Sequence, residues 1–346
     1  MNKIISIFLV LMLLLGILAV PALAEENVGV LSYLGLSAEE DETLRVSIRQ
    51  PLIKLLYLHG VLTNDGNAGS GSAPTLNYYD SLNALLMALQ SEQVNEIKVP
   101  YYTAKYLCST NDDLKIFEEY HPEKVNETTE VALRRLSDGY SFMMKEESTA
   151  LRDTFDAQIK AMKEDGTLQK LIDEHIIKVA DGGEPIAVNF EQFEGDPIRI
   201  GVTGDLPPMD YVAPDGSFAG FNTAVLAEIG KRLQKNIELV QVENVGRSLA
   251  LSEGVVDVVF WTRGLSENMV DNLVANRGHS DEELAAKRAE RLEAMTDEEK
   301  AILEALVAPS DEEKAKINGR DMPAGTIITR PYFSDFPVLV TLKEAE

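Results

Sequence analysis

The sequence has a single cysteine, Cys108, and only four scattered histidines. One cysteine cannot form an intramolecular disulfide, and the histidines lack the spacing of metal ligands. The sequence also lacks the Walker loop and the G-x-G-x-x-G loop that cradle phosphates in nucleotide-binding proteins. These absences argue against a disulfide scaffold, and they leave no candidate metal site and no candidate cofactor.

Basic residues are few: 32 Lys and Arg stand against 57 Asp and Glu, a formal net charge of −25 at pH 7. Nucleic acid requires a basic surface, and anionic lipid attracts basic segments, so we expect neither as a partner. An acidic surface chiefly favours solubility. No positioned acid–base pair stands out, so we expect no catalytic residues and no enzymatic activity.

The N-terminus begins with Lys3, an apolar run over residues 4–20 and the sequence "PALA" at 21–24. A positive start, an apolar stretch and an A-x-A site are typical of a signal peptide, here residues 1–24. The alternative is an anchor that stays in the membrane. No cysteine follows the run, so lipid attachment there is excluded. We expect an exported protein, periplasmic or extracellular.

The mature chain is long enough for two domains. Residues 25–177 form the first, an α/β domain in which Gly166 ends an amphipathic helix over 150–166. Residues 178–196 are rich in glycine and acid and predict an interdomain linker. Residues 197–346 alternate strand and helix, with Asn222 expected to cap a helix, which predicts a parallel sheet with helices on its faces.

An acidic segment over about residues 265–320 interrupts the second domain. It contains "SDEE" at Ser280, "TDEE" at Thr296 and "SDEE" at Ser310. Each is a hydroxyl residue followed three positions later by Glu, the pattern of a capping box. We interpret the segment as short inserted helices. The simpler alternative is a solvated surface excursion.

Three stretches of the second half resemble the bacterial extracellular solute-binding proteins, family 3, which serve amino-acid ABC importers. They are "IRIGVTGDLPPMDYVAPDGSFAGFN" at 198–222, "ALSEGVVDVV" at 250–259 and "TRPYFSD" at 329–335. The resemblance implies a two-lobed, periplasmic-binding-protein-like α/β fold of type II. It further implies a monomer that delivers a small solute to an ABC permease in the membrane.

The first half resembles the later part of that family's pattern. Residues 78–108 are similar to helix and strand elements of the second lobe, and residues 141–176 to the closing element, which comes last in the family. The family's opening follows here instead. The resemblance therefore implies a circularly permuted lobe order. The alternative is two fused fragments, each completed by another chain.

The resemblance also implies a ligand site between the lobes, where an amino acid or related zwitterion needs partners for its carboxylate, its ammonium and its side chain. Ligands of open α/β sheets bind at the carboxyl ends of the strands. Met209 stands where the family has a pocket aromatic, and Arg263 is the nearest substitute for the family's carboxylate-binding Arg. The candidates are Asp205, Met209, Tyr211, Trp261, Thr262 and Arg263 from one lobe and Tyr101 and Tyr102 from the other.

Simpler roles remain open for three of these residues. Tyr211 could pack on the adjacent hairpin, Trp261 could belong to the core, and Arg263 could pair with a surface Glu. Two other functions also remain open. One is a sensory or scaffold module that has lost standard ligand binding, and the other is a dehydratase-like enzyme on the same fold.

Overall fold

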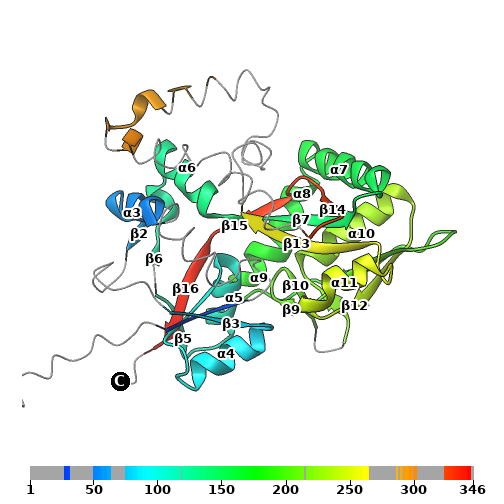
Figure 1. Ribbon diagram of the computed structural model, residues 1–346, viewed down its shortest axis with the longest axis horizontal. Helices are drawn as coiled ribbons and strands as arrows, with labels where there is room; N and C mark the ends of the chain where they lie inside the picture. Colours follow the sequence, from blue (N-terminus) through cyan, green and yellow to red (C-terminus); the bar gives the residue numbers. More distant parts are fainter. Residues whose placement is uncertain are drawn as a thin grey trace, which may run out of the picture.

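The computed structural model describes residues 27–31, 50–63, 75–117, 119–213, 216–264 and 323–343, together with short stretches between 286 and 301. The predicted signal peptide and most of the predicted acidic insert lie outside these ranges. Among the described residues, no helix has the length and apolar character that crossing a membrane requires. The described chain is a mixed α/β structure with two larger sheets (Figure 1).

The first sheet has the strand order β3-β1-β4-β16-β5. Strand β1 is parallel to β3 and β4, and β16 is antiparallel to β4 and β5. Helices α4 (Leu82–Gln90) and α5 (Tyr101–Thr110) accompany these strands. The strands are β1 (Asn27–Leu31), β3 (Thr75–Tyr79), β4 (Glu96–Pro100), β5 (Leu114–Ile116) and β16 (Pro337–Leu342).

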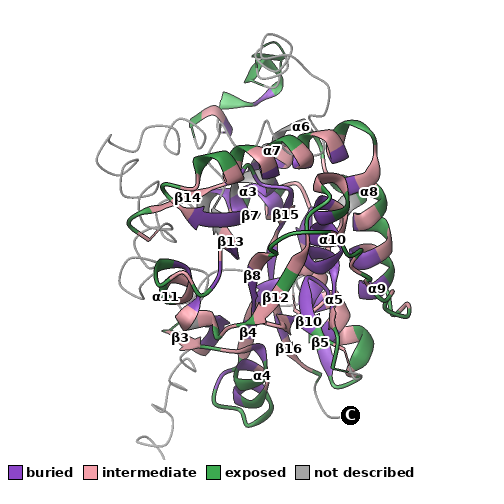
Figure 2. Cartoon of the chain, turned by 90° about the vertical axis from the view of Figure 1, so that its right-hand side faces the viewer, coloured by how far each residue is buried: buried purple, intermediate pink, exposed green. Residues whose placement is uncertain are grey.

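The second sheet has the order β12-β8-β13-β7-β14, and β15 also pairs with β7. Its strands are β7 (Asp138–Lys145), β8 (Ile198–Val202), β12 (Ile237–Gln241), β13 (Val258–Gly264), β14 (Thr326–Ile328) and β15 (Phe333–Asp335). Its helices are α7 (Thr149–Glu164), α8 (Thr167–Ile172), the π-helical turn η4 (Asp173–Ile177), α9 (Lys178–Ala180), α10 (Phe221–Leu233) and α11 (Arg247–Ser252). Buried strands lie inside and exposed helix faces outside (Figure 2).

Two smaller sheets complete the described strands. Strand β2 (Leu62–Thr63) pairs with β6 (Glu119–Tyr120) beside helices α3 (Gln50–Leu58) and α6 (Glu127–Leu136). Near the second sheet, β10 pairs with β9 and β11. The remaining elements are β9 (Asp205–Leu206), β10 (Asp210–Val212), β11 (Phe218–Ala219), η3 (Pro122–Lys124) and η5 (Asn244–Gly246).

The chain crosses between the two larger sheets twice, from α6 into β7 and from β15 into β16. Strand β7 pairs with β13 over six residue pairs, although the two come from different predicted domains. The division predicted at residues 178–196 therefore does not coincide with the division between the sheets. The physical reason is that β7 is buried along nearly its whole length. Its backbone N–H and C=O groups therefore need hydrogen bonds from a strand on each side.

The core of the second sheet joins distant parts of the sequence through Phe142 of β7. Its ring stacks on Tyr332 with centroids 4.7 Å apart and meets Phe155 of α7 edge-on at 5.3 Å. The Tyr332 hydroxyl donates to Asn222 Oδ1 at 2.8 Å. Asn222 therefore lies inside α10 as a buried acceptor. Its prediction as the helix cap is wrong, because Gly220 holds that position.

Several local predictions are confirmed. Phe155, Ile159 and Met162 form the buried face of α7. Gly166 follows α7 with a left-handed φ of 83°. The capping box at Thr296 is present: Thr296 N donates to Glu299 Oε2 at 2.6 Å, and Glu299 N donates to Thr296 Oγ1 at 3.2 Å. The boxes predicted at Ser280 and Ser310 lie outside the described residues.

Candidate functional site

The two larger sheets meet where several of their strands end. Asp80 follows β3 of the first sheet, whereas Asp205 and Asn244 lie beyond β8 and β12 of the second. Asn244 Nδ2 donates to the Asp80 carbonyl oxygen at 3.0 Å and to Asp205 Oδ2 at 3.2 Å. We call this contact the interlobe edge. It lies at the carboxyl ends of parallel strands, the position where ligands of open α/β sheets bind.

Tyrosine rings line the same interface. Tyr106 of α5 faces Tyr211 of β10 with centroids 6.3 Å apart, so the two lobes touch through this pair. Burial raises the pKa of Tyr211 to about 12, so its hydroxyl remains protonated at neutral pH. Tyr101 packs edge-on against Tyr102 at 5.3 Å, and Tyr102 lies 6.0 Å from Phe333 of β15.

The two crossing strands pair at the base of the interface, where Asp335 lies opposite Asp138. Asp335 is 5% exposed. Its Oδ2 accepts from Tyr102 N at 3.1 Å, and its Oδ1 accepts from Phe336 N at 2.8 Å. Burial, with a contribution from Asp138, raises the pKa of Asp335 to about 8. We call this pair the hinge pair.

The hinge pair changes what the start of α5 can offer a ligand. Tyr101 N donates to the Phe336 carbonyl at 2.8 Å, and Tyr102 N donates to Asp335. A helix N-terminus can bind an anion through such free amides, but here the chain itself occupies both. Tyr101 and Tyr102 can therefore contribute their rings or hydroxyls to a ligand, whereas their amide groups are already hydrogen-bonded to Phe336 and Asp335.

Some buried oxygen atoms of the second lobe have no hydrogen-bond partner. Within the described part of the chain they include Asp205 Oδ1 and Thr262 Oγ1. Both residues lie toward the carboxyl ends of β8 and β13, which are neighbouring parallel strands. A buried acceptor without a donor costs about 1–3 kcal/mol. A bound molecule with N–H or O–H groups would relieve that cost.

A second buried carboxylate braces the turn that carries Asp205. Asp210 is 3% exposed, and its Oδ2 accepts from Thr203 N at 3.0 Å and from Thr203 Oγ1 at 3.1 Å. Burial raises its pKa, and nearby Asp205 adds to the effect. These hydrogen bonds fix the turn between β8 and β10.

The other predicted site residues have different surroundings. Met209 is fully buried in the core, and Trp261 lies under the guanidinium of Arg247, whose Cζ is 5.0 Å from the ring centroid. Arg247 is itself buried and donates from Nη1 to the Phe260 carbonyl at 2.8 Å. The backbone of Arg263 pairs with Gly139, while its side chain lies outside the description.

Four residues of the interface were not predicted: Asp80, Tyr106, Asn244 and Asp335. Asp80 and Asn244 are polar residues just beyond strands, a signal that could have found them. Tyr106 lies one helical turn from Tyr102, which would also have pointed to it. Asp335 gave no such signal, because its role depends on the pairing of two strands distant in sequence.

Among the described residues no group of three or more His, Cys, Asp or Glu could hold a metal.

Residues 198–266 match the family model of the bacterial extracellular solute-binding proteins, family 3. That match covers a minority of the chain. No curated protein matches. The first-domain resemblance therefore lies outside this match. The turn at residues 205–211, which holds the candidates Asp205, Met209 and Tyr211 and which we call the candidate turn, lies within it.

Several solved structures match this chain, each with a TM-score below 0.5. One is NikA from Staphylococcus aureus in complex with Ni(L-His)2, with 13% identity and a TM-score of 0.35, covering 78% of this chain and 57% of that chain. Another is the BvgS VFT2 domain of Bordetella pertussis, with 10% identity, a TM-score of 0.34 and coverages of 91% and 79%. A phosphate-binding protein of a Streptococcus pneumoniae ABC transporter has 10% identity, a TM-score of 0.31 and coverages of 91% and 89%. The two larger sheets and their helices confirm the predicted α/β class.

Proposed function

We propose that this protein is an exported solute-binding protein that captures a small zwitterion, such as an amino acid, between its lobes for delivery to an ABC importer. The observation that carries the proposal is the family match over residues 198–266, because this segment holds the candidate turn. The buried, unpartnered oxygens of Asp205 and Thr262 add to it. An ammonium group carries the donors that such acceptors need.

Capture works by closure of the lobes around the two crossings. A solute that contacts both lobes makes its full set of contacts only in the closed state, so binding shifts the population toward closure. The bond from Asn244 to Asp80 and the ring contact of Tyr106 with Tyr211 link the two lobes in this structure. The pairing of Asp138 with Asp335 lies between the crossings and is the natural hinge.

We also propose that the lobe order is permuted. In support, the described chain starts in the first sheet, passes into the second at β7 and returns to the first with β16. Each lobe is thus completed by a segment of this same chain, which favours permutation over two fragments that each need another chain. The expected product of export is a monomer.

Export itself has a direct test. Cleavage after Ala24 should leave Glu25 as the mature N-terminus, because the small residues Ala22 and Ala24 suit a signal peptidase. Intact-mass measurement of the exported protein checks this. Retention of residues 1–24 would contradict both the cleavage site and the proposed location.

Titration calorimetry of the mature chain against a panel of amino acids separates the three functions. Saturable heat of binding without turnover supports solute capture. Turnover of a ligand would favour the dehydratase-like enzyme. Heat from none of the ligands would favour the sensory module.

Substitution of Asp205 and of Arg263 should weaken capture of whichever amino acid binds. A charged hydrogen bond is worth about 1.5–3 kcal/mol, so Asp205→Ala and Arg263→Ala should each raise Kd by about ten- to a hundredfold. The control is Asp112→Ala, which removes an exposed carboxylate from a turn of the other lobe. Unchanged Kd in either site variant would remove that residue from the site.

A further inference from the structure

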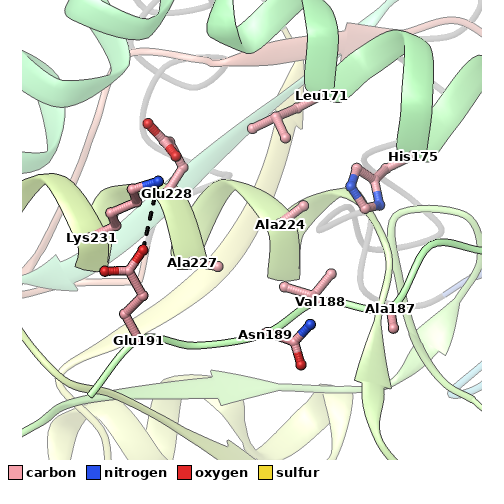
Figure 3. Close-up of a pocket in the computed structure, with 10 residues that line it drawn as sticks. All are labelled: Leu171, His175, Ala187, Val188, Asn189, Glu191, Ala224, Ala227, Glu228 and Lys231. Carbon is pink, nitrogen blue, oxygen red and sulfur yellow. Dashed lines mark ion pairs between the residues drawn. The ribbon is translucent and has the colours of Figure 1, made fainter.

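A pocket of about 220 Å³ lies in the lobe of the second sheet and shares no residue with the interlobe edge. Helix α10 forms one wall, and α8 with the π-helical turn η4 forms another (Figure 3). The segment 184–192, which we call the strap, covers the third side. The lining residues are Leu171, His175, Ala187, Val188, Asn189, Glu191, Ala224, Ala227, Glu228 and Lys231.

Half of the ten lining residues are apolar, and the α10 side is hollow because Ala224 and Ala227 carry small side chains. Ala224 and Ala227 of α10 face Leu171 and Val188 across the pocket (Figure 3). An apolar cavity of about 150 Å³ suffices to bind benzene. The volume here therefore fits a molecule with a single ring or a short aliphatic body.

One buried polar residue lines the pocket. His175 lies on the π-helical turn η4, and such turns occur frequently at functional sites. The residue is 6% exposed, and within the described residues its side chain makes no hydrogen bond to protein, while its ring is directed to the pocket (Figure 3). Burial lowers the pKa of His175, so the ring is neutral at pH 7 and offers one donor and one acceptor.

The charges at the mouth of the pocket already have partners. Lys231 Nζ lies 3.6 Å from Glu191 Oε1 of the strap, and Glu228 Oε1 accepts from Arg232 Nε at 2.6 Å. A charged ligand would have to compete with these pairs. An uncharged ligand would leave them intact.

The strap is attached mainly at its two ends. Gly183 N donates to the Lys178 carbonyl at 2.9 Å, and Asn236 exchanges hydrogen bonds with the backbone of Phe193 at 2.8 and 2.7 Å. Between these anchors, residues 184–192 make no backbone hydrogen bond in the described structure. The strap can therefore adjust to a molecule beneath it without breaking secondary structure.

We propose that this pocket binds a small uncharged molecule of the phenol class, with its apolar body between α10 and the strap and its hydroxyl hydrogen-bonded to His175. A hydroxyl group is both donor and acceptor, as is a neutral imidazole. The alanines provide the space. The charged groups at the mouth already have partners, so the ligand does not need a charge. This site is separate from the interlobe edge and does not depend on the proposed zwitterion.

The probe for this proposal is 4-fluorophenol, titrated with the mature chain and observed by ¹⁹F NMR. Wild type should give a saturable shift with a Kd of about 1 mM or tighter, as the small size of the probe allows. Ala227→Leu fills the pocket and should abolish the saturable shift. Ala157→Leu makes the same change on the exposed face of α7 and should leave Kd unchanged.

A second variant keeps the test independent of packing at α10. His175→Phe retains a ring but removes the hydrogen bond, and it should weaken binding by about fivefold to tenfold. Circular dichroism confirms that each variant is folded. No saturable binding by wild type would overturn the proposal, as would binding by Ala227→Leu equal to that of wild type, since the probe would then lie elsewhere.

Discussion

The protein is expected to lose stability as the pH rises from about 4 to about 8, because Asp335 keeps its proton in the folded state until near pH 8. An Asp in an unfolded chain releases its proton near pH 4. Between these values the unfolded state binds fewer protons than the folded state, so the free energy of unfolding falls with pH. The slope is on the order of 1 kcal/mol per pH unit.

The surroundings of Asp335 explain the direction. Burial raises its pKa most, the hydrogen bonds from the amides of Tyr102 and Phe336 lower it, and Asp138 on the facing strand raises it by a smaller amount than these. Tyr101 and Tyr120 lie in the same cluster and have raised pKa values themselves, so both stay neutral through this range. None of the groups that shift the pKa of Asp335 carries a positive charge, so no cation offsets the cost of burying the ionised carboxylate.

Urea unfolding at pH 5 and pH 8 measures the effect. Asp335→Asn imitates the protonated carboxyl and should remove most of the loss between the two pH values. Asp138→Asn should reduce it in part, and Asp153→Asn, at an exposed position on α7, should leave it unchanged. Buried Asp210 contributes with the same sign, so the difference between wild type and Asp335→Asn isolates the hinge pair. Equal pH dependence in those two proteins would contradict the prediction.

Gly220→Ala is expected to destabilise the protein by more than about 3 kcal/mol, a cost reserved for strained or clashing sites. Gly220 has a φ of 106°, and a Cβ there would lie 2.6 Å from the Met209 carbonyl oxygen and 2.8 Å from that of Pro208. These oxygens cannot move freely, because Asn222 N and Phe221 N donate to them at 2.8 and 3.1 Å. The substitution therefore breaks the start of α10.

The matched control is Gly216→Ala in the same hairpin region. Gly216 has a φ of 85°, but no heavy atom would lie within 4 Å of the added Cβ. It should cost only the left-handed backbone conformation, about 1–2 kcal/mol. Urea unfolding of both variants gives the comparison. If both substitutions lower the free energy of unfolding by the same amount, movement of the turn relieves the clash at Gly220. That result would contradict a rigid start of α10.

Local patterns in the sequence predicted the elements that depend on neighbouring residues. The apolar spacing of Phe155, Ile159 and Met162 and the glycine at 166 were enough to place α7 and its end. The hydroxyl–Glu spacing at Thr296 was enough to predict its capping box. Such features follow from helix geometry and capping chemistry, which act over a few residues.

Tertiary structure alone decided how these elements combine. The sequence of β7 does not predict its partner, and the strand pairs with β13, more than a hundred residues away. For the same reason the fully buried position of Met209 and the role of Asp335 were not foreseen. By itself the sequence determined an α/β chain and the segment that carries the candidate turn. The placement of the lobes and the hinge required the structure, because strand pairing and burial are set by contacts between residues far apart in the chain.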